Sequence, residues 1–330
     1  MRRLTDPPPQ SSHARFRDRI PRYLLTVDTE EEFDWSRPLA RDTHGTAHVT
    51  WLAKFQQFCE REEVVPTYMV DWPVANSPTA AEILREPLAK RRAEIGIQLH
   101  PWVNPPHDEE VSEANSFAGN LPHQLEAAKL CNLRDAIECN FGVLPLIYRA
   151  GRYGVGPNTA EILAEAGIAI DSSVRPKFDY SAAGGPDFSA HPVSPYWLDK
   201  DRTLLELPLT TCFWGLLRQQ GDTLFPKLAA MPTLRSLLAR TGMLERVPLT
   251  PEGTSVDEAI RGIDIALDDR LPLLLFSFHS PSLQPGHTPY VRDEDDLDAL
   301  YDWWRAIFEY LRQRGVRRSS VSEIMQAIER

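Results

Sequence analysis

Asp28 and Glu30 are the residues whose types and spacing point most directly to chemistry. They follow an apolar run, 23–27, and stand in a dense group of carboxylates. Strand side chains alternate between two faces, so Asp28 and Glu30 are expected to point the same way, roughly 7 Å apart. That geometry suits one metal ligand and one general base. The alternative is a strand that runs into a solvated acidic turn, because charge runs usually face water.

Three further apolar runs also end in polar residues of catalytic type. They are 94–99 before His100, 144–148 before Arg149, and 271–278 before His279. The carboxyl ends of parallel strands meet at one rim of an α/β barrel. A single histidine or arginine at a strand end is more often a structural group. Four such ends in one chain favour a functional site at that rim.

The segments between these runs have helical patterns. Apolar residues recur at helical spacing over 124–141, and Gly142 is well placed to end that helix. Ser255 and Glu258 have the spacing of a capping box at the start of another helix. A long amphipathic helix is predicted over 297–311. This alternation of strands and helices predicts one α/β domain, a distorted parallel (β/α) barrel, over two separate domains.

Two segments do not follow the alternation. Residues 1–22 are rich in proline, serine and arginine, and we predict a flexible N-terminal leader there. Residues from about 176 to 251 are rich in proline, glycine and aromatic residues, with one helix predicted over 233–246. The barrel is therefore expected to span 23–330, with an irregular insertion at about 176–251.

The composition of the chain limits its partners. Over 330 residues the formal net charge is −11, which argues against nucleic acid and anionic membranes, since both need a basic surface. No run approaches the length of a transmembrane helix, and the leader lacks the apolar core of a secretion signal. The four cysteines show no paired spacing, so we expect reduced thiols in a cytoplasmic protein. The sequence does not predict an oligomeric state.

The order of these motifs resembles the polysaccharide deacetylases with a NodB-homology domain, in particular their WalW-like branch. The resemblance covers about 23–324, nearly the whole chain. It implies a barrel of the NodB-homology type and a hydrolase that removes an acetyl group from an N-acetylated sugar or glycan precursor. The motifs that carry it are Thr26-Val-Asp28, Glu94-Ile-Gly96 with His100, Tyr148-Arg149 with Tyr153-Gly154, Asp171-Ser-Ser-Val-Arg-Pro176, and Phe278-His279.

The resemblance also implies roles for individual residues. Asp28 would be the base that takes a proton from water, and Arg149 would keep it ionised and oriented. His279 would be the acid that protonates the departing amine. Trp102 and Tyr153 would stack on a sugar ring of the carbohydrate substrate, and the alternative for both is aromatic core packing.

A divalent metal ion, with zinc as the first candidate, is the cofactor that the resemblance implies. The chain departs from the family at two ligand positions: Thr29 replaces a second aspartate, and Asn104 replaces a second histidine. The metal ligands are therefore expected to be Glu30, His100 and Asn104, with Asp28 itself as the alternative to Glu30. Pro105 limits the segment to at most one distorted helical turn. Such an oxygen-rich set could hold zinc, hold a harder ion, or hold no metal.

Two other functions stay open on sequence alone. One is a catalytically silent barrel that binds a sugar or a protein partner, and the other is a cyclic-amide or ureide hydrolase on the same barrel. Should His279 be structural, His107 and His287 are the next candidates for the acid. The missing secretion signal favours an intracellular glycan precursor over a finished wall polymer.

Overall fold

The structure is a computed structural model that describes residues 1–33, 37–42, 44–228 and 231–329. The strands are β1 (Arg22–Thr29), β2 (Thr67–Val70), β3 (Glu94–Leu99), β4 (Ile147–Ala150), β5 (Ile170–Asp171), β6 (Tyr196–Trp197), β7 (Leu205–Glu206), β8 (Thr211–Trp214), β9 (Glu245–Pro248), β10 (Leu273–His279) and β11 (Arg317–Arg318). The α-helices are α1 (Leu52–Arg61), α2 (Trp72–Ala75), α3 (Pro78–Ala89), α4 (His123–Phe141), α5 (Thr159–Glu165), α6 (Gly221–Leu228), α7 (Pro232–Arg240), α8 (Val256–Asp268), α9 (Glu294–Gln313) and α10 (Val321–Ala327).

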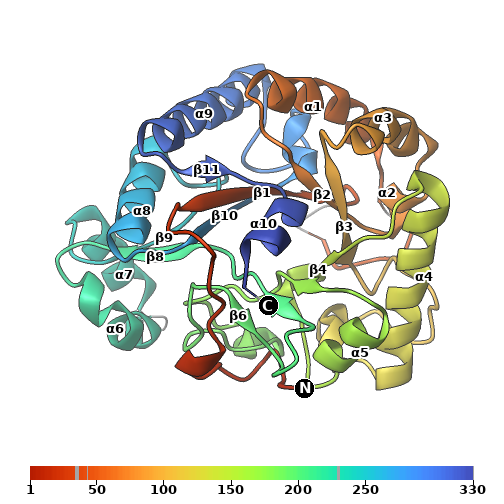
Figure 1. Ribbon diagram of the computed structural model, residues 1–330, viewed down its shortest axis with the longest axis horizontal. Helices are drawn as coiled ribbons and strands as arrows, with labels where there is room; N and C mark the ends of the chain where they lie inside the picture. Colours follow the sequence, from red (N-terminus) through yellow and green to blue (C-terminus); the bar gives the residue numbers. More distant parts are fainter. Residues whose placement is uncertain (34–36, 43, 229–230, 330) are drawn as a thin grey trace.

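A curled sheet of mostly parallel strands forms the barrel. Its order is β10-β1-β2-β3-β4-β5-β7-β6, β11 pairs with the start of β1, and β8 pairs only with β9. The helices α1, α3, α4, α8 and α9 surround this sheet (Figure 1). The predicted α/β class and the distorted parallel barrel are confirmed.

Along the paired strands β1 and β10, the side chains inside the barrel change from apolar to polar. Alternate residues of each strand, such as Leu24, pack inside the barrel, while the residues between them, such as Val27 and Phe278, pack in the larger core under the helices. This is the period of two that strand geometry imposes. Apolar partners at the base give way to polar partners at the carboxyl end, in the order Leu24–Leu275, Thr26–Ser277 and Asp28–His279.

The helix α10 closes the base of the barrel. Val321 and Ile324 are almost completely buried and join the same inner cluster as Leu24 and Ile147. In Figure 1 this helix lies in the middle of the ring of strands. A capping box between Ser320 and the third helical residue begins it. The rim at the carboxyl ends of the strands is therefore the end left open for a site.

Backbone hydrogen bonds close the remaining side of the barrel without a regular ladder. The Thr210 N–H donates to the Leu275 carbonyl at 3.4 Å, and the Ser277 N–H donates to the Leu249 carbonyl at 3.3 Å. The segments next to β8 and β9 thus lie along β10. This irregular seam is the distortion of the barrel, and it falls within the stretch predicted as an insertion.

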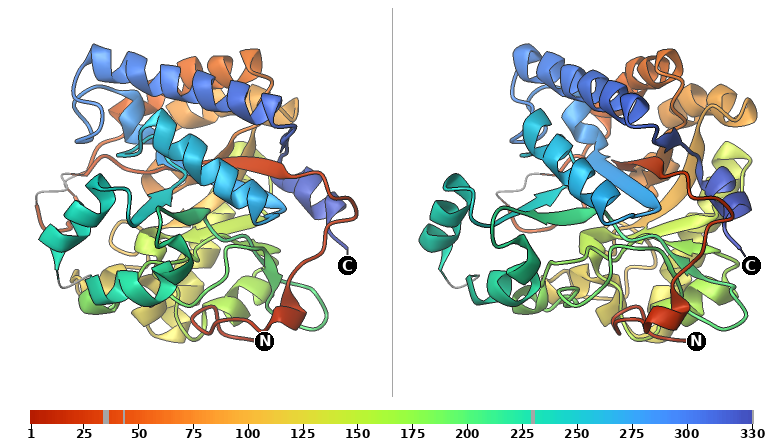
Figure 2. Two further views of the ribbon diagram at one scale, coloured as in Figure 1. Left: turned by 90° about the vertical axis from the view of Figure 1, so that its left-hand side faces the viewer. Right: turned by 60° about the vertical axis from the view of Figure 1, so that its left-hand side comes forward.

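The 176–251 region is therefore more than an insertion. Its strands β6 and β7 extend the main sheet, and α6 and α7 lie at one side of the molecule (Figure 2). The helix predicted over 233–246 is wrong at its carboxyl end, since α7 ends at Arg240 and β9 follows. Gly242, with φ of 69°, lets the chain reverse there.

Residues 1–22 were predicted as a flexible leader, but the segment packs against the barrel and its last residue, Arg22, begins β1. The side chain of Leu4 is completely buried. Backbone N–H groups of Ala14 and Arg17 donate, each at 2.9 Å, to carbonyls beside β6 and at the end of α10. The segment runs along the outside of the barrel before it enters β1 (Figure 2). Composition missed these contacts because the pairing groups are backbone atoms, which every residue carries.

Candidate active site

A cavity of about 720 Å³ opens at the carboxyl-terminal rim of the barrel. Asp28 of β1, Arg149 of β4 and His279 of β10 all line it. The nearest side-chain atoms of Asp28 and His279, Oδ2 and Nε2, are 4.0 Å apart. Both groups can therefore meet one substrate, as a catalytic base and acid must.

Arg149 supports the carboxylate of Asp28. Its Nη1 donates to Asp28 Oδ1 and to Ser277 Oγ, the latter at 3.1 Å. Its Nη2 donates to Thr26 Oγ1 at 3.0 Å and to Ser172 Oγ at 3.1 Å, and its Nε donates to the Ser172 carbonyl at 2.9 Å. A guanidinium has five N–H groups, so each one has a partner. This fully paired and fully buried side chain is a rigid support for Asp28.

His279 is held by a carboxylate that the sequence did not single out. Its Nδ1 lies 2.6 Å from Glu252 Oε2, and its backbone N–H donates to the other oxygen of Glu252 at 3.2 Å. Burial of the imidazole opposes protonation. The charge of Glu252, and after it those of Glu30 and Asp28, outweigh burial and raise the pKa of His279 to about 10. At neutral pH the imidazole is therefore a proton donor aimed at the cavity.

Contacts with neighbouring residues fix the orientation of the His100 ring. Its Nδ1 lies 2.7 Å from Glu31 Oε2, and its ring stacks on the indole of Trp102 with centroids 4.4 Å apart. A carboxylate can only accept, so Nδ1 carries the proton and Nε2 faces Glu30. Gly151 makes room for the ring, because a Cβ there would lie 2.3 Å from the imidazole. The ring is thus fixed in one orientation.

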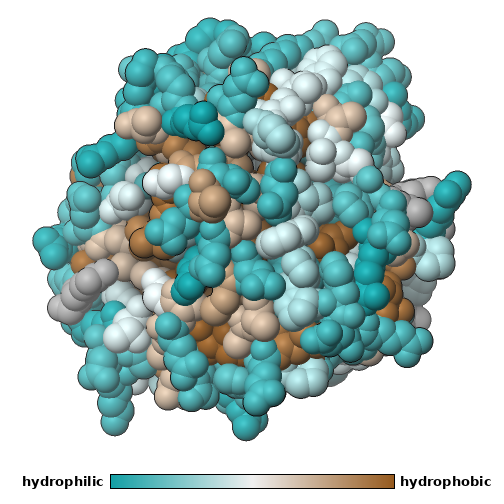
Figure 3. Space-filling view, turned by 90° about the vertical axis from the view of Figure 1, so that its right-hand side faces the viewer, coloured by the Kyte–Doolittle hydropathy of each residue, from teal (hydrophilic) through white to brown (hydrophobic). Residues whose placement is uncertain are grey.

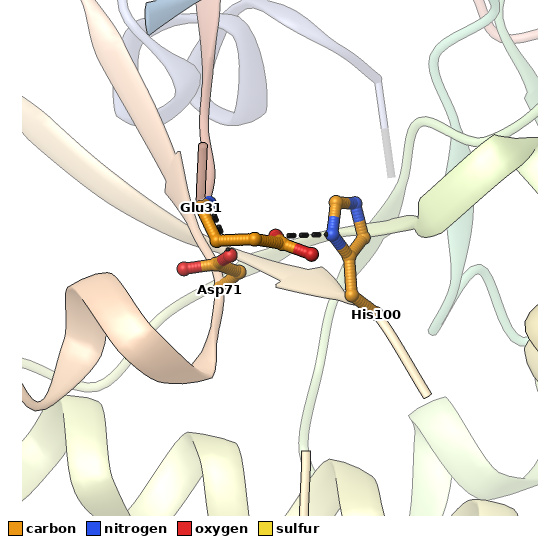
Figure 4. A group of neighbouring side chains, drawn as sticks. All are labelled: Glu31, Asp71 and His100. Carbon is orange, nitrogen blue, oxygen red and sulfur yellow. Dashed lines mark hydrogen bonds and ion pairs between the residues drawn. The ribbon is translucent and has the colours of Figure 1, made fainter. Parts of the chain in front are cut away.

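The only group of three acidic or imidazole residues that brings its ligand atoms within 4.8 Å of one another, among the residues described, is Glu31, Asp71 and His100 (Figure 4). Protein donors already occupy this group. Glu31 Oε1 accepts from the Trp102 indole at 2.7 Å, and the two oxygens of Asp71 accept backbone N–H groups of Glu31 and Val74 at 2.6 and 2.9 Å. The group could hold a metal only by giving up these bonds, so its contacts favour a role in positioning His100.

A second set of donors faces the cavity itself. Glu30 Oε2 lies 2.8 Å from Gln98 Nε2 and 3.4 Å from His100 Nε2, and the two nitrogens are 3.3 Å apart. Gln98 is almost completely buried, and its Oε1 has no hydrogen-bond partner. The coordination edges of a cation with bonds of about 2.1 Å are roughly 3.0–3.4 Å long, which is close to these separations. The three side chains therefore fit a divalent cation.

Asn104, the third ligand expected from sequence, is not brought to this set. The predicted single turn forms, since the Asn104 N–H donates to the His100 carbonyl at 3.2 Å. The Asn104 amide then donates to the carbonyls of Pro105 and Lys129, both at 2.8 Å. The side chain is buried in its own loop and does not line the cavity. Its position corrects the predicted ligand set.

The two aromatic residues predicted to stack on a sugar both line the cavity, but they differ in exposure. Trp102 is only 3% exposed, and its ring packs on His100 while its N–H donates to Glu31. Tyr153 is half-buried, lines the cavity and stacks on Tyr180 with centroids 5.7 Å apart. The geometry thus leaves Tyr153 accessible to a ligand and assigns Trp102 mainly to packing.

Several residues of the site were missed from sequence. Gln98 and Ser277 each lie two residues before a predicted site histidine on the same strand, so the alternation of strand faces could have found them. Glu252 carried no such signal, because it lies in a loop after β9. His107 and His287, the alternative acids, do not line the cavity.

The fold of the chain is similar to that of a solved structure. A solved structure of a Mycobacterium smegmatis protein assigned as a polysaccharide deacetylase covers 97% of this chain and 93% of its own, with 17% identity and a TM-score of 0.55. The barrel therefore has the NodB-type polysaccharide deacetylase fold, as predicted. The WalW-like branch stays a prediction.

Two further solved structures are similar at lower TM-scores. An allantoinase covers 98% of this chain and 93% of its own, at 12% identity and a TM-score of 0.49. A Pseudomonas aeruginosa PAO1 protein assigned as a polysaccharide deacetylase covers 94% and 90%, at 14% identity and a TM-score of 0.47. No protein-family profile and no curated protein matches the chain.

Proposed function

We propose that this protein is a hydrolase that removes the acetyl group from an N-acetylated sugar. The observation that carries the proposal is the approach of His279 Nε2 to within 4.0 Å of Asp28 Oδ2 at one cavity floor. Hydrolysis of an amide needs a base for the water and an acid for the amine, both within reach of one bond. The rigid Arg149–Asp28 pair and the protonated His279 supply these two groups.

The residues of the chain account for each proton in this reaction. As the water oxygen bonds to the carbonyl carbon, Asp28 accepts a proton from the water. When the carbon–nitrogen bond breaks, the amine nitrogen takes the proton of His279 Nε2. Acetic acid and the free amine leave and ionise to acetate and ammonium in water, and the proton on Asp28 passes to His279, directly or by exchange through solvent. Both groups then return to their starting states.

Glu30, His100 and Gln98 are the residues that would hold a divalent metal ion, with zinc as the first candidate. Turning the Gln98 amide over would bring its unpaired Oε1 toward Glu30 and His100 as a third ligand. The contact of His100 Nδ1 with Glu31 is the arrangement that metal-binding histidines use. A bound ion would lower the pKa of a water ligand and polarise the acetamide carbonyl.

The deacetylase proposal is tested with a substrate panel of N-acetyl sugars and cyclic ureides, measuring acetate and ammonia or ureide products. Asp28→Asn and His279→Ala should each lower turnover by about 10²–10⁴-fold, since that is the usual worth of a positioned base or acid. Asp264→Asn, a carboxylate on α8 that pairs with Arg314, is the matched control and should keep wild-type turnover.

Three outcomes would overturn the proposal. Ureide hydrolysis without acetate release would assign a different amide to the same residues. Sugar binding with no turnover would make the barrel catalytically silent. Wild-type turnover in His279→Ala would make His279 a structural residue at the end of β10.

The metal proposal is tested by zinc, manganese, cobalt and nickel content in the wild type, His100→Ala, Gln98→Leu and Gln98→Glu. Loss of a metal ligand should weaken metal binding by at least about tenfold, since even the loss of a hydrogen bond that supports a ligand has an effect of that size. Gln98→Glu restores an oxygen donor and should retain the ion. Near-zero content in every protein rejects the metal site, and equal content in the wild type and Gln98→Leu removes Gln98 from it.

A further inference from the structure

A second arginine of the cavity, Arg175, is paired very differently from Arg149. It lines the same cavity, in the loop that follows β5. Its guanidinium lies 4.9 Å from the ring centroid of Tyr153 and 4.0 Å from that of Phe178. One N–H donates to the Tyr180 hydroxyl at 3.2 Å, and no carboxylate among the residues described forms an ion pair with Arg175.

Other cationic groups on the cavity wall do have carboxylate partners. Arg149 pairs with Asp28, Arg152 lies 3.4 Å from Glu113, and His279 lies 2.6 Å from Glu252. A guanidinium has five N–H donors, and only one of those on Arg175 has a described protein partner. Removing a charge from water costs free energy unless the charge is paired. An anion from outside the chain would therefore stabilise the guanidinium of Arg175.

The surroundings hold the Arg175 fork in place. Aromatic rings pack against its planar group, which fixes the orientation of the N–H donors before any ligand arrives. Tyr153 and the residue before it, Arg152, both have left-handed backbone, with φ of 60° and 54°. Two successive non-glycine residues in that region are strained, and such strain is concentrated at ligand sites.

A second positive charge lies close by, and it too has no carboxylate partner among the residues that the structure describes. The guanidinium of Arg246 lies 3.4 Å from the Phe178 ring centroid. Burial, together with the charge of Arg175, lowers the pKa of Arg246 to about 10. The two cations thus disfavour each other in the folded protein, and an anion beside Arg175 would relieve that repulsion.

We propose that Arg175 binds an oxyanion carried by the substrate, so that the substrate is an N-acetylated sugar bearing a phosphate or a carboxylate. The planar fork of arginine matches both groups through two parallel hydrogen bonds. The assignment of that anion to a sugar rests on the proposed deacetylation, whereas the anion site itself does not. Arg175 shares its cavity with Asp28 and His279, so one molecule can reach all three.

The anion site is tested without catalysis. Inorganic phosphate is titrated calorimetrically into wild type, Arg175→Met and Arg246→Met, each freed of metal with a chelator. Arg175→Met should weaken phosphate binding about 10–100-fold, since hydrogen bonds to charged groups have that worth. Arg246→Met, which removes a cation beside the same ring but outside the cavity, should weaken it far less. Equal affinity in all three proteins, or no binding by the wild type, would overturn the inference.

The source of the anion is tested by kinetics. Deacetylation of N-acetylglucosamine, its 1-phosphate and N-acetylmuramic acid distinguishes a neutral, a phosphorylated and a carboxylated sugar. In the wild type one charged sugar should have the higher kcat/KM, and Arg175→Met should lower its advantage over the neutral sugar about 10–100-fold, mainly through KM. Equal use of all three sugars overturns the inference and leaves deacetylation intact. Phosphate binding at Arg175 without any deacetylation would support the anion site and reject the proposed deacetylase function.

Discussion

At the scale of single residues, the neighbours of a side chain decide which chemistry it can perform. His100 is a buried imidazole and His279 a half-buried one, and both contact carboxylates. Nδ1 of His279 is held by Glu252 and its Nε2 faces Asp28, whereas Nε2 of His100 faces Glu30 and Gln98. The first arrangement suits proton donation, and the second suits metal binding. The residue type alone does not separate these two roles.

Replacement of Glu252 should change the pH dependence of the reaction. A raised pKa means that His279 stays protonated up to about pH 10 and loses its proton above it. The alkaline limb of kcat/KM should therefore lie near that pH. Glu252→Gln removes the largest effect that raises this pKa, so the limb should move toward the usual histidine value of about 6.5.

The measurement is kcat/KM from pH 5 to 11 in the wild type and Glu252→Gln. Ser282→Ala serves as the control, because it removes a hydrogen bond to Glu252 at 2.6 Å but keeps its charge. If the alkaline limb stays in place in Glu252→Gln, His279 is not the group that titrates in the reaction.

At the scale of elements, the short strands β5 and β7 carry a buried acid pair below the cavity. Asp171 and Glu206 lie opposite each other in the strand register, and both are fully buried. Burial, and then the charge of Asp171, raise the pKa of Glu206 well above its usual value. Burial also raises the pKa of Asp171. The pair is therefore expected to share a proton that keeps two neighbouring strands together.

That proton links stability to pH. The folded protein keeps it, while the unfolded chain releases it above a pH of about 4.5. The free energy of unfolding should therefore fall as the pH rises above that value. Glu206→Gln imitates the protonated acid, so at pH 8 it should raise the free energy of unfolding by about 1–3 kcal/mol.

Urea denaturation of the wild type and Glu206→Gln at pH 4 and pH 8 measures this effect. The two proteins should differ at pH 8 and converge at pH 4. Glu165→Gln, at an exposed acid of α5 outside this pair, is the comparison variant and should show no such dependence on pH. A difference of the same size at both pH values would show that Glu206 acts through packing and not through its proton.

At the scale of the whole molecule, the two ends of the chain hold the barrel together from outside. The N-terminal segment pairs with the neighbourhood of β6 and with the end of α10, which itself closes the barrel base.

The surface of the molecule is mixed in polarity: on the face in Figure 3, hydrophilic side chains interrupt the hydrophobic areas. No helix among the described residues is long and apolar enough to cross a membrane.

The N-terminal segment should therefore contribute to stability. Leu4 is completely buried, and its carbonyl lies 3.0 Å from Nε2 of His191. Leu4→Ala should lower the free energy of unfolding by about 2–5 kcal/mol, the usual cost of emptying a buried leucine site. Ile20, which is 38% exposed in the same segment, is the control, and Ile20→Ala should change stability by less than about 0.5 kcal/mol.

Denaturant unfolding of the two variants measures this contribution. Since neither Leu4 nor Ile20 lines the cavity, turnover at low temperature should stay at the wild-type level in both variants. Equal stability of the wild type and Leu4→Ala would restore the sequence prediction of a flexible leader.

Local sequence patterns were enough to predict the barrel and the strand ends that carry Asp28, His100, Arg149 and His279. Hydrophobic periodicity and helix capping are properties of neighbouring residues, so α4, which ends before Gly142 at a φ of 71°, and the capping box of α8 could be predicted from short segments. The end of α7 was missed although Gly242, with φ of 69°, gives the same local signal, because the predicted helix ran on into β9, which forms by pairing with β8 more than 30 residues earlier in the chain.

The sequence by itself determined which residues could do chemistry and on which strands they lie. Tertiary structure alone decided which of them meet. Asn104 has a plausible spacing from His100, yet its amide is used by carbonyls of its own loop and of α4. Glu252 has no local signal, and the motif that contains Arg175 does not reveal what this arginine does, because the importance of both residues comes from partners far away in the chain or from the lack of one. Hydrogen-bond pairing and desolvation depend on distances in space, and a sequence pattern records only distances along the chain.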